Sequence, residues 1–295
     1  MLEVIELSSW SEFENIIKKQ IGKELDHIQS GPFFYRGQPD ATWHLETTLE
    51  RYFGPNFAVS SYYSEIKTIQ HRIETFTDNN WDLPASFKYH NQLKSGENIL
   101  NKTLIDYLQY LRHFGYPSPL LDWSYSPYVA AYFAFRELAS KAKSIAIHEF
   151  FAVSELGENP YYIKSSKENT PAVICPIRGS SQRTKRHHLQ QSAYTYCIKK
   201  INGRYCYVSH EDPDILPTEE TERSGEWVVK YIIPASERLN ALRSLEAYNI
   251  NAYSLLGTED SLLETLSLQT YRKRERLINI YGGTHPEDIA RRRSG

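Results

Sequence analysis

The sequence predicts an α+β domain in which the strands lie mostly in the second half of the chain. Strand-like and helix-like segments alternate without repeats up to residue 143, and strand-like segments then dominate as far as residue 234. No stretch has the composition of a linker between domains. The chain of 295 residues is 40% hydrophobic, which is enough for a substantial core.

The first elements are predicted from apolar periodicity. Residues 2–7 alternate as a strand does, and helical spacing begins after a cap at Ser9 or Ser11. The apolar segment "PFFYR" at 32–36 predicts a second strand. Residues 59–79 then repeat their apolar side chains at helical spacing and predict a helix over the sheet.

Glycine and proline set the ends of the next two helices. Gly115 ends the helix predicted at 102–115, because glycine adopts the conformation that closes a helix. Pro127 suits the first position of a helix at 127–142, and Ser126 can cap its free N–H groups.

The second half is predicted to be rich in strands, with polar loops at 155–169 and 209–225. The expected strands are 144–153, 172–177, 192–198, 204–209 and 226–234, followed by helices at 236–248 and 259–271. We therefore expect one domain over residues 1–270 and a basic C-terminal tail over 271–295.

Composition and charge exclude several classes of protein. No apolar run approaches the ~20 residues of a membrane span, and the N-terminus lacks the pattern of a signal peptide, so we expect a cytoplasmic protein without a membrane partner. Three cysteines without CxxC spacing predict neither a metal site nor disulfides. The net charge of -2 argues against a protein that binds nucleic acid nonspecifically over its whole surface, although "RTKRHH" at 183–188 is locally basic.

Missing motifs narrow the chemistry further. The sequence contains no GxGxxG after a strand, no GxxxxGK[ST], no HExxH and no GxSxG. These absences argue against a Rossmann dehydrogenase, a P-loop NTPase, a zincin and an α/β-hydrolase.

The first polar cluster lies in "FFYRGQ", where Arg36 follows three aromatic residues. Such an arginine either closes a structural ion pair or holds a phosphate or carboxylate in a pocket. Gly37 beside it lets another group approach the backbone closely. Both interpretations of Arg36 remain open from the sequence.

The second cluster lies between "PLL" and the start of the apolar helix at Pro127. Asp122, Trp123, Ser124 and Ser126 are presented where backbone N–H groups and the helix dipole favour an anion, which predicts a phosphate or ribose site. The alternative is that the aspartate and the serines only cap the helix.

The third cluster is "RHHLQQSAYTY", preceded by further cations. Arg183, Lys185 and Arg186 could contact the phosphates of a nucleic acid at the rim of a cleft, or could lie in a solvated loop. The 22 tyrosines of the chain suit base stacking, but packing in the sheet and core is the favoured explanation.

Together the three clusters resemble the FRG-domain family, which is named for a Phe/Tyr-Arg-Gly motif. Tyr35-Arg36-Gly37 matches that motif, "RHFGYPSPLLDWSYSPYVAAYFA" matches the central pattern QHYGxPTxLLDWTxxPxxAxYFA, and "QQSAYT" matches a QQGAFT-like strand. The resemblance spans roughly residues 30–270. Arg112 stands where glutamine is usual, and Ser192 replaces a glycine.

The order of the clusters also resembles that of ADP-ribosyltransferases of the Arg-Ser-Glu type. This resemblance implies a split β-sheet core with helical insertions, and NAD as a substrate. Arg36 would hold the NAD phosphate or ribose, and Ser124 or Ser126 would support the nicotinamide ribose. The residues beside them, Tyr35, Gly37, Gln38 and Trp123, complete the implied cofactor-binding set.

A glutamine falls where that resemblance implies a catalytic glutamate. We assign this role to Gln191 rather than Gln190, because on a strand Gln191 would share a face with the small Ala193 and with Thr195, leaving room for a ligand.

A base is then needed to activate the acceptor. Either His113 or Asp122 could supply it. His113 has a suitable ordinary pKa, because an unperturbed histidine titrates at ~6.5. The alternative is that His113 only bonds the end of its helix.

These expectations combine into an NAD-dependent ADP-ribosyltransferase-like toxin or phage-defence effector that modifies a macromolecule, with nucleic acid favoured over protein. The alternative is a noncatalytic nucleotide- or nucleic-acid-binding module regulated by a partner protein, such as an antitoxin. A scaffold held by such a partner is the third interpretation.

Overall fold

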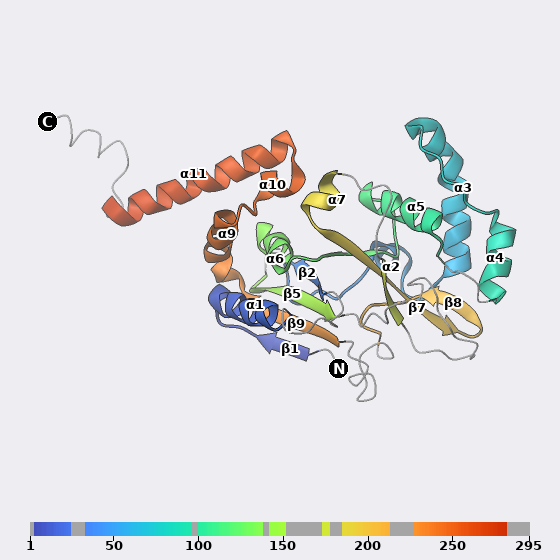
Figure 1. Ribbon diagram of the computed structural model, residues 1–295, viewed down its shortest axis with the longest axis horizontal. Coiled ribbons are helices and arrows are strands. Elements are labelled where there is room, and N and C mark those ends of the chain that lie inside the picture. The colour runs from blue at the N-terminus through green and yellow to red at the C-terminus, as the bar shows by residue number, and fades with distance from the viewer. Residues whose placement is uncertain are drawn as a thin grey trace.

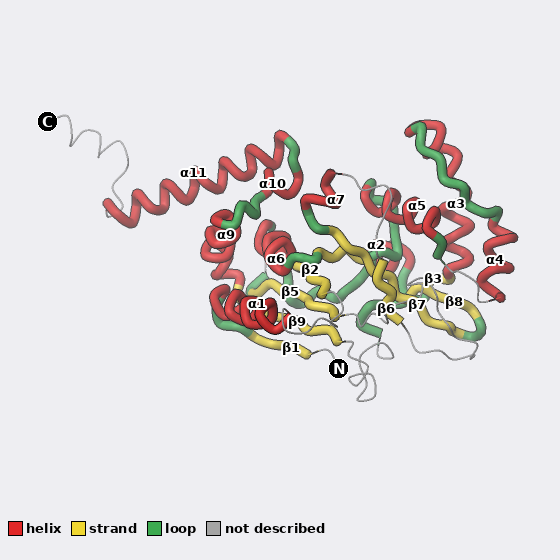
Figure 2. Tube along the Cα trace, viewed as in Figure 1, coloured by secondary structure: helices red, strands yellow, loops and turns green. Residues whose placement is uncertain are grey.

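In the residues that it describes, a computed structural model of the chain shows a mixed α+β fold built on one mostly antiparallel sheet of nine strands (Figures 1 and 2). The structure describes residues 3–24, 33–95, 100–137, 142–151, 173–177, 185–212 and 227–281. The strands are β1 (Glu3–Glu6), β2 (Phe33–Gln38), β3 (Phe57–Ala58), β4 (Leu121–Ser124), β5 (Ser144–Phe151), β6 (Val173–Ile177), β7 (Ser192–Ile201), β8 (Arg204–Tyr207) and β9 (Trp227–Pro234). Their order in the sheet is β1-β9-β5-β2-β4-β7-β8-β3, and β6 pairs with β7.

The sheet opens between β2 and β4, near its middle. Among the described residues these two strands pair only at Tyr35 and Ser124, whereas β2 pairs with β5 along its whole length. β4 in turn pairs with β7 from Leu121 to Ser124. The two halves of the sheet are therefore joined by one residue pair, and the strands diverge beyond it.

Three helices cover the half of the sheet that contains β1, β9, β5 and β2. They are α1 (Trp10–Glu24), α6 (Pro127–Arg136) and α9 (Arg238–Ala247) (Figure 1). Gly37 explains how closely α6 approaches β2, because a Cβ at this position would lie 1.9 Å from the carbonyl oxygen of Ala130. The group that approaches the Gly37 backbone is thus a helix of the same chain.

Three other helices pack against β7 and β8 in the opposite half. They are α3 (Val59–Thr77), α4 (Ser86–Ser95) and α5 (Lys102–His113) (Figure 1). Their shared core is rich in tyrosine, and the hydroxyls reach backbone carbonyls: Tyr63 donates to Pro84 at 2.6 Å and Tyr107 donates to Ile66 at 3.1 Å. Much of the tyrosine surplus is therefore used in core packing.

The remaining helices are short, except for the last. They are α2 (Thr48–Phe53), α7 (Lys185–Leu189), the 3-10 turn η1 (Ala235–Glu237), α10 (Ala252–Leu256) and α11 (Glu259–Tyr281). Figure 1 shows α11 extending away from the sheet. No helix in the described part of the chain combines the length and apolar character needed to cross a membrane.

Most of the predicted elements are present, with several differences. The sequence patterns did not predict β4 or α7, and α6 ends at Arg136, before the expected residue 142. The expected start of the tail at residue 271 falls inside α11, which continues to Tyr281. The predicted polar loop at 155–169 lies outside the described residues.

Candidate functional site

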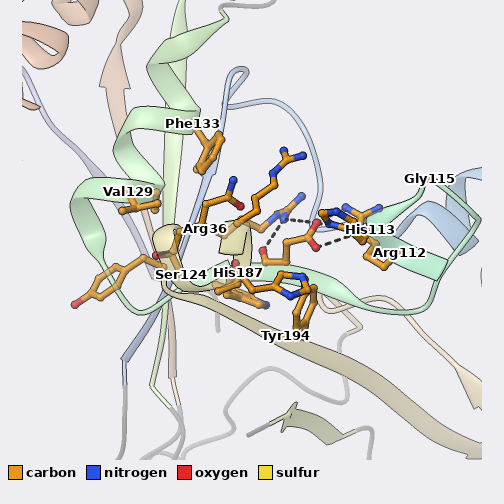
Figure 3. Close-up of a pocket in the computed structure, with 17 residues that line it drawn as sticks. Arg36, Arg112, His113, Gly115, Ser124, Val129, Phe133, His187 and Tyr194 are labelled. Atoms are coloured by element: carbon orange, nitrogen blue, oxygen red, sulfur yellow. Dashed lines mark hydrogen bonds and ion pairs between the residues drawn. The ribbon is translucent and has the colours of Figure 1, made fainter. Parts of the chain in front are cut away.

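A cavity of about 410 Å³ lies where the sheet opens between β2 and β4 (Figure 3). Its walls come from α6, the end of α5, α7 and the start of β7. The volume is in the range of small-molecule sites. Gly115 has a positive φ of 83° and turns the chain after α5, and His113, the last residue of that helix, lines the cavity.

Arg36 lies in the wedge between the diverging strands. Its Nη1 donates to the backbone carbonyl of Asp122 at 2.6 Å and lies 3.9 Å from a carboxylate oxygen of the same residue. Its Nη2 makes no hydrogen bond to a described residue, and the side chain lines the cavity. Arg36 therefore closes an ion pair and also presents a cation to the cavity.

Burial lowers the pKa of Arg36 to about 10. The charge of Asp122 acts in the opposite direction, while Arg112 and Arg51 add to the lowering. Because this pKa remains well above neutral pH, the guanidinium is charged under ordinary conditions.

Asp122 is held by a second arginine. The Nε of Arg112 donates to the two carboxylate oxygens at 3.1 and 2.9 Å, its Nη2 contacts one of them, and its Nη1 reaches the Thr48 hydroxyl at 3.2 Å. Burial works against ionisation, but the charge and hydrogen bonds of Arg112, together with Arg36, hold the pKa of Asp122 below its usual value. A carboxylate held this way accepts a proton poorly, which weakens its candidacy as the base.

The two serines of the central cluster have different local partners. The Ser124 hydroxyl donates to the backbone carbonyl of Gln190 at 2.8 Å and accepts from the Ser126 amide at 3.0 Å. The Ser126 hydroxyl accepts from the amide of Val129 at 3.3 Å and caps α6. Ser124 lines the cavity, and Ser126 is absent from its lining residues.

Of the other residues expected to bind the cofactor, Tyr35 and Gly37 line the cavity and Gln38 does not. The Gln38 side chain is buried, and its amide donates to the His44 carbonyl at 2.9 Å. Trp123 also lines the cavity, but its ring belongs to a hydrophobic core, and its Nε1 donates to the Thr195 hydroxyl at 2.7 Å. Gln38 and the Trp123 ring are thus tied into the fold.

A group of basic and aromatic side chains lies opposite α6 (Figure 3). The rings of His113 and His187 have centroids 5.4 Å apart, and the Nε2 of His187 lies 2.6 Å from the Tyr194 hydroxyl. Burial lowers the pKa of His113, the charge of Arg186 lowers it further, and Asp122 acts the other way. His113 is consequently neutral at physiological pH and can accept a proton.

The structure corrects the placement of the two glutamines. β7 begins at Ser192, so neither glutamine lies on the strand. Gln191 is exposed in the preceding turn with a φ of +48°, and it is Gln190 that lines the cavity, with its amide 3.3 Å from the Leu255 carbonyl. The geometric reason for choosing Gln191 was wrong, because Gln190 and Gln191 lie in the turn between α7 and β7 and not on a strand with alternating faces.

The part of the basic segment that the structure describes, from Lys185 onward, lies in α7. Arg186 lines the cavity, Lys185 is exposed on the same helix, and Arg183 lies outside the described residues. Among the described residues, no group of three or more histidine, cysteine, aspartate or glutamate side chains could hold a metal ion.

Several lining residues were missed in the sequence. Val129 and Phe133 are spaced as neighbours on one helical face, a signal that was visible after Pro127. Tyr194 faces the site because it pairs with Asp122 across β4 and β7, which no local pattern reveals.

Comparison with family models places part of the chain in a known family. Residues 31–143 match the family model of the FRG domain. This segment contains the Tyr35-Arg36-Gly37 motif and the central motif up to α6, but it ends before the "QQSAYT" strand. The comparison with curated proteins gave no match, and neither did the comparison with solved structures.

Proposed function

We propose that this chain, which carries an FRG domain, binds NAD in the cavity between β2 and β4 and transfers ADP-ribose from it to a macromolecule. The observation that carries the proposal is the division of the cavity into an apolar wall and a cationic wall. A nucleotide has the same division, with flat apolar rings at one end and phosphates at the other.

The apolar wall is formed by α6. Val129, Ala130 and Phe133 line the cavity, and Phe133 offers a ring against which a base or a nicotinamide could stack. Gly37 makes this wall possible, because the absence of a Cβ lets α6 lie directly on β2. A ligand ring would therefore meet a helix that is held firmly against the sheet.

The cationic wall contains three arginines and one carboxylate. Asp122 engages the Nε and Nη2 of Arg112, and Thr48 engages its Nη1, whereas Arg36 contacts Asp122 through Nη1 alone and Arg186 is exposed on α7, so Arg36 and Arg186 are the arginines that we assign to a ligand. Guanidinium groups bind phosphate oxygens with directed, charge-assisted hydrogen bonds. The excess of positive charge favours an anionic ligand such as a pyrophosphate.

The proposed reaction depends mainly on positioning. Cleavage of the nicotinamide glycosidic bond passes through an oxocarbenium-like transition state, and the leaving group is already cationic before it departs. It therefore needs no acid to expel it. Ser124 lies at the junction of β4 and α6, where it would face the ribose, and Gln190 replaces Gln191 as our candidate for a ribose contact.

We further propose nucleic acid as the acceptor and a toxin or antiviral-defence effector as the biological role. Lys185 and Arg186 place exposed cations on α7 at the cavity, and Arg183 precedes them in the sequence. Such a cluster suits the phosphates of RNA or DNA. We propose that an antitoxin-like protein regulates the activity, as expected for such an effector.

The second candidate function is a noncatalytic nucleotide-binding module. It is favoured by one observation: among the described residues that line the cavity, Asp122 is the one carboxylate, and it is engaged by two arginines. A site without a free carboxylate can bind a nucleotide without processing it.

Incubation with labelled NAD separates these functions. Transfer of label to RNA, DNA or protein supports the enzyme, and saturable NAD binding without turnover supports the module. If the protein shows neither transfer nor binding, the result supports a scaffold. If nucleic acid is the acceptor, its binding must weaken with salt and must fall when Arg183, Lys185 and Arg186 are all replaced by glutamine. Binding that survives both changes would contradict a nucleic-acid acceptor.

A further inference from the structure

The side of the cavity opposite α6 holds two histidines that touch each other. His113 is the last residue of α5, and His187 lies on α7. Their ring centroids are 5.4 Å apart with an interplanar angle of 66°, so the edge of one ring faces the other. Figure 3 shows both rings at the same end of the cavity as Arg112 and Tyr194.

Tyr194 holds the second histidine in place. Its hydroxyl lies 2.6 Å from the Nε2 of His187, and the two rings meet at 88° with centroids 5.7 Å apart. Tyr194 is itself held on β7, where it pairs with Asp122 of β4. Side-chain contacts from Tyr194 to His187 and from His187 to His113 therefore link the sheet to the C-terminal end of α5.

We infer that His113 is the base that takes the proton of the acceptor, and that His187, held by Tyr194, is the positioning residue that aims it. This inference rests on the proposed transfer from NAD. The acceptor O–H gives its proton to an imidazole nitrogen of His113, and its oxygen forms the new bond to C1′ of the ribose. The C1′–N bond breaks, and its electron pair leaves with nicotinamide, which becomes neutral.

The other titratable groups of the cavity are less suited to this step. Asp122 is paired with Arg36 and Arg112, burial raises the pKa of the Tyr194 phenol above its usual value, and the Nε2 of His187 lies 2.6 Å from the Tyr194 hydroxyl. His113 makes no hydrogen bond to a described residue, and its ring is partly exposed. Of these groups, the imidazole of His113 is the one with a nitrogen ready for a proton at neutral pH.

The charges around His113 keep it unprotonated. Burial and the positive charge of Arg186 lower its pKa, and Asp122 opposes them. The charged or titratable groups that face it are Arg112 on its own helix, Asp122 on β4, Arg186 and His187 on α7, and Tyr194 on β7. The reaction rate should therefore rise with pH through the pKa of His113 and then level off.

The test measures single-turnover transfer from labelled NAD as a function of pH, together with the NAD dissociation constant. His113→Asn should lower the transfer rate roughly 100- to 10,000-fold with NAD binding nearly unchanged, as for a lost general base. Tyr194→Phe should lower the transfer rate by a smaller factor and move the acid limb of the pH–rate profile. His188→Asn is the matched control, because His188 is exposed on α7 and does not line the cavity.

Arg186→Gln provides a second variant on an exposed position, where folding is not at risk. Removing this cation should raise the pKa of His113, so the acid limb of the rate profile should move to higher pH. Arg72→Gln, an exposed arginine on α3, should leave the profile in place.

The outcomes separate this inference from the proposed function. If wild type consumes no NAD at any pH, both proposals fail. If wild type transfers ADP-ribose while His113→Asn keeps the same rate and pH profile, the transfer function stands and the inference fails. An acid limb that Tyr194→Phe and Arg186→Gln both leave unmoved would also overturn it.

Discussion

Replacing Arg36 by lysine is expected to weaken NAD binding roughly 10- to 150-fold while the chain stays folded. The guanidinium uses Nη1 on the Asp122 carbonyl, at 2.6 Å, and its Nη2 has no described partner. A single lysine ammonium cannot occupy both places, because it lacks the planar fork of arginine. The lost ligand contact is a charge-assisted hydrogen bond worth about 1.5–3 kcal/mol, and each 1.4 kcal/mol is tenfold in affinity.

Isothermal titration calorimetry with NAD measures the effect directly, and thermal unfolding shows whether the variant is folded. Arg72→Lys on α3 is the matched control, because Arg72 is exposed and does not line the cavity. It should bind NAD as wild type does.

A lysine variant that binds NAD with wild-type affinity would refute the reasoning, because it would show that Nη2 contributes nothing to the ligand. Loss of the folded state in both Arg36→Lys and Arg36→Ala would also refute it, and would favour a purely structural ion pair with Asp122.

Three further predictions concern the same junction. Gly37→Ala should destabilise the fold by about 3 kcal/mol or prevent folding, because its Cβ would meet the Ala130 carbonyl oxygen at 1.9 Å. A variant that unfolds at the same denaturant concentration as wild type would contradict this prediction. Asp122→Asn should lower the free energy of unfolding at neutral pH by about 1 kcal/mol, because the Asp122 side chain is 41% exposed and solvent screens its ion pairs. The pKa of Asp122 is lower in the folded state than in the unfolded state, so its contribution to stability is present above the unfolded pKa and is lost as pH falls through the folded pKa. The stability of the variant should therefore depend less on acid pH than that of wild type. Unfolding measured over a series of acid pH values tests this. Gln190→Ala should reduce NAD turnover more than Gln191→Ala, since only the first residue lines the cavity, and equal rates for the two variants would count against a ribose contact.

Local sequence patterns predicted the helices and strands that carry most of the site. Gly115 ends α5 with a positive φ, as expected, and Ser126 with Pro127 starts α6. Arg36 lies on a strand, as its apolar neighbours indicated. These features depend on caps, turn conformations and short-range periodicity, which the sequence carries within a few residues.

β4 was missed because it is short and its partners are distant. It contains four residues, "LDWS", in which the apolar Leu121 and Trp123 alternate with Asp122 and Ser124. Four residues beside a proline-rich turn are too few to separate a strand from a loop by periodicity. The strand is stabilised by pairing with β7, and it meets β2 at one residue pair.

The sequence by itself determined that the chain has an α+β core, an arginine beside a glycine on an early strand, and a polar segment before an apolar helix. Only the tertiary structure decided that Arg36 meets Asp122 across 86 residues, that Arg112 neutralises the same carboxylate, that Gln190 rather than Gln191 faces the cavity, and that Tyr194 holds His187. The physical reason is the range of the interactions. Helix ends are decided by hydrogen bonds within one turn, whereas the pairing of distant strands and the partners of buried charges follow from the packing of the whole sheet.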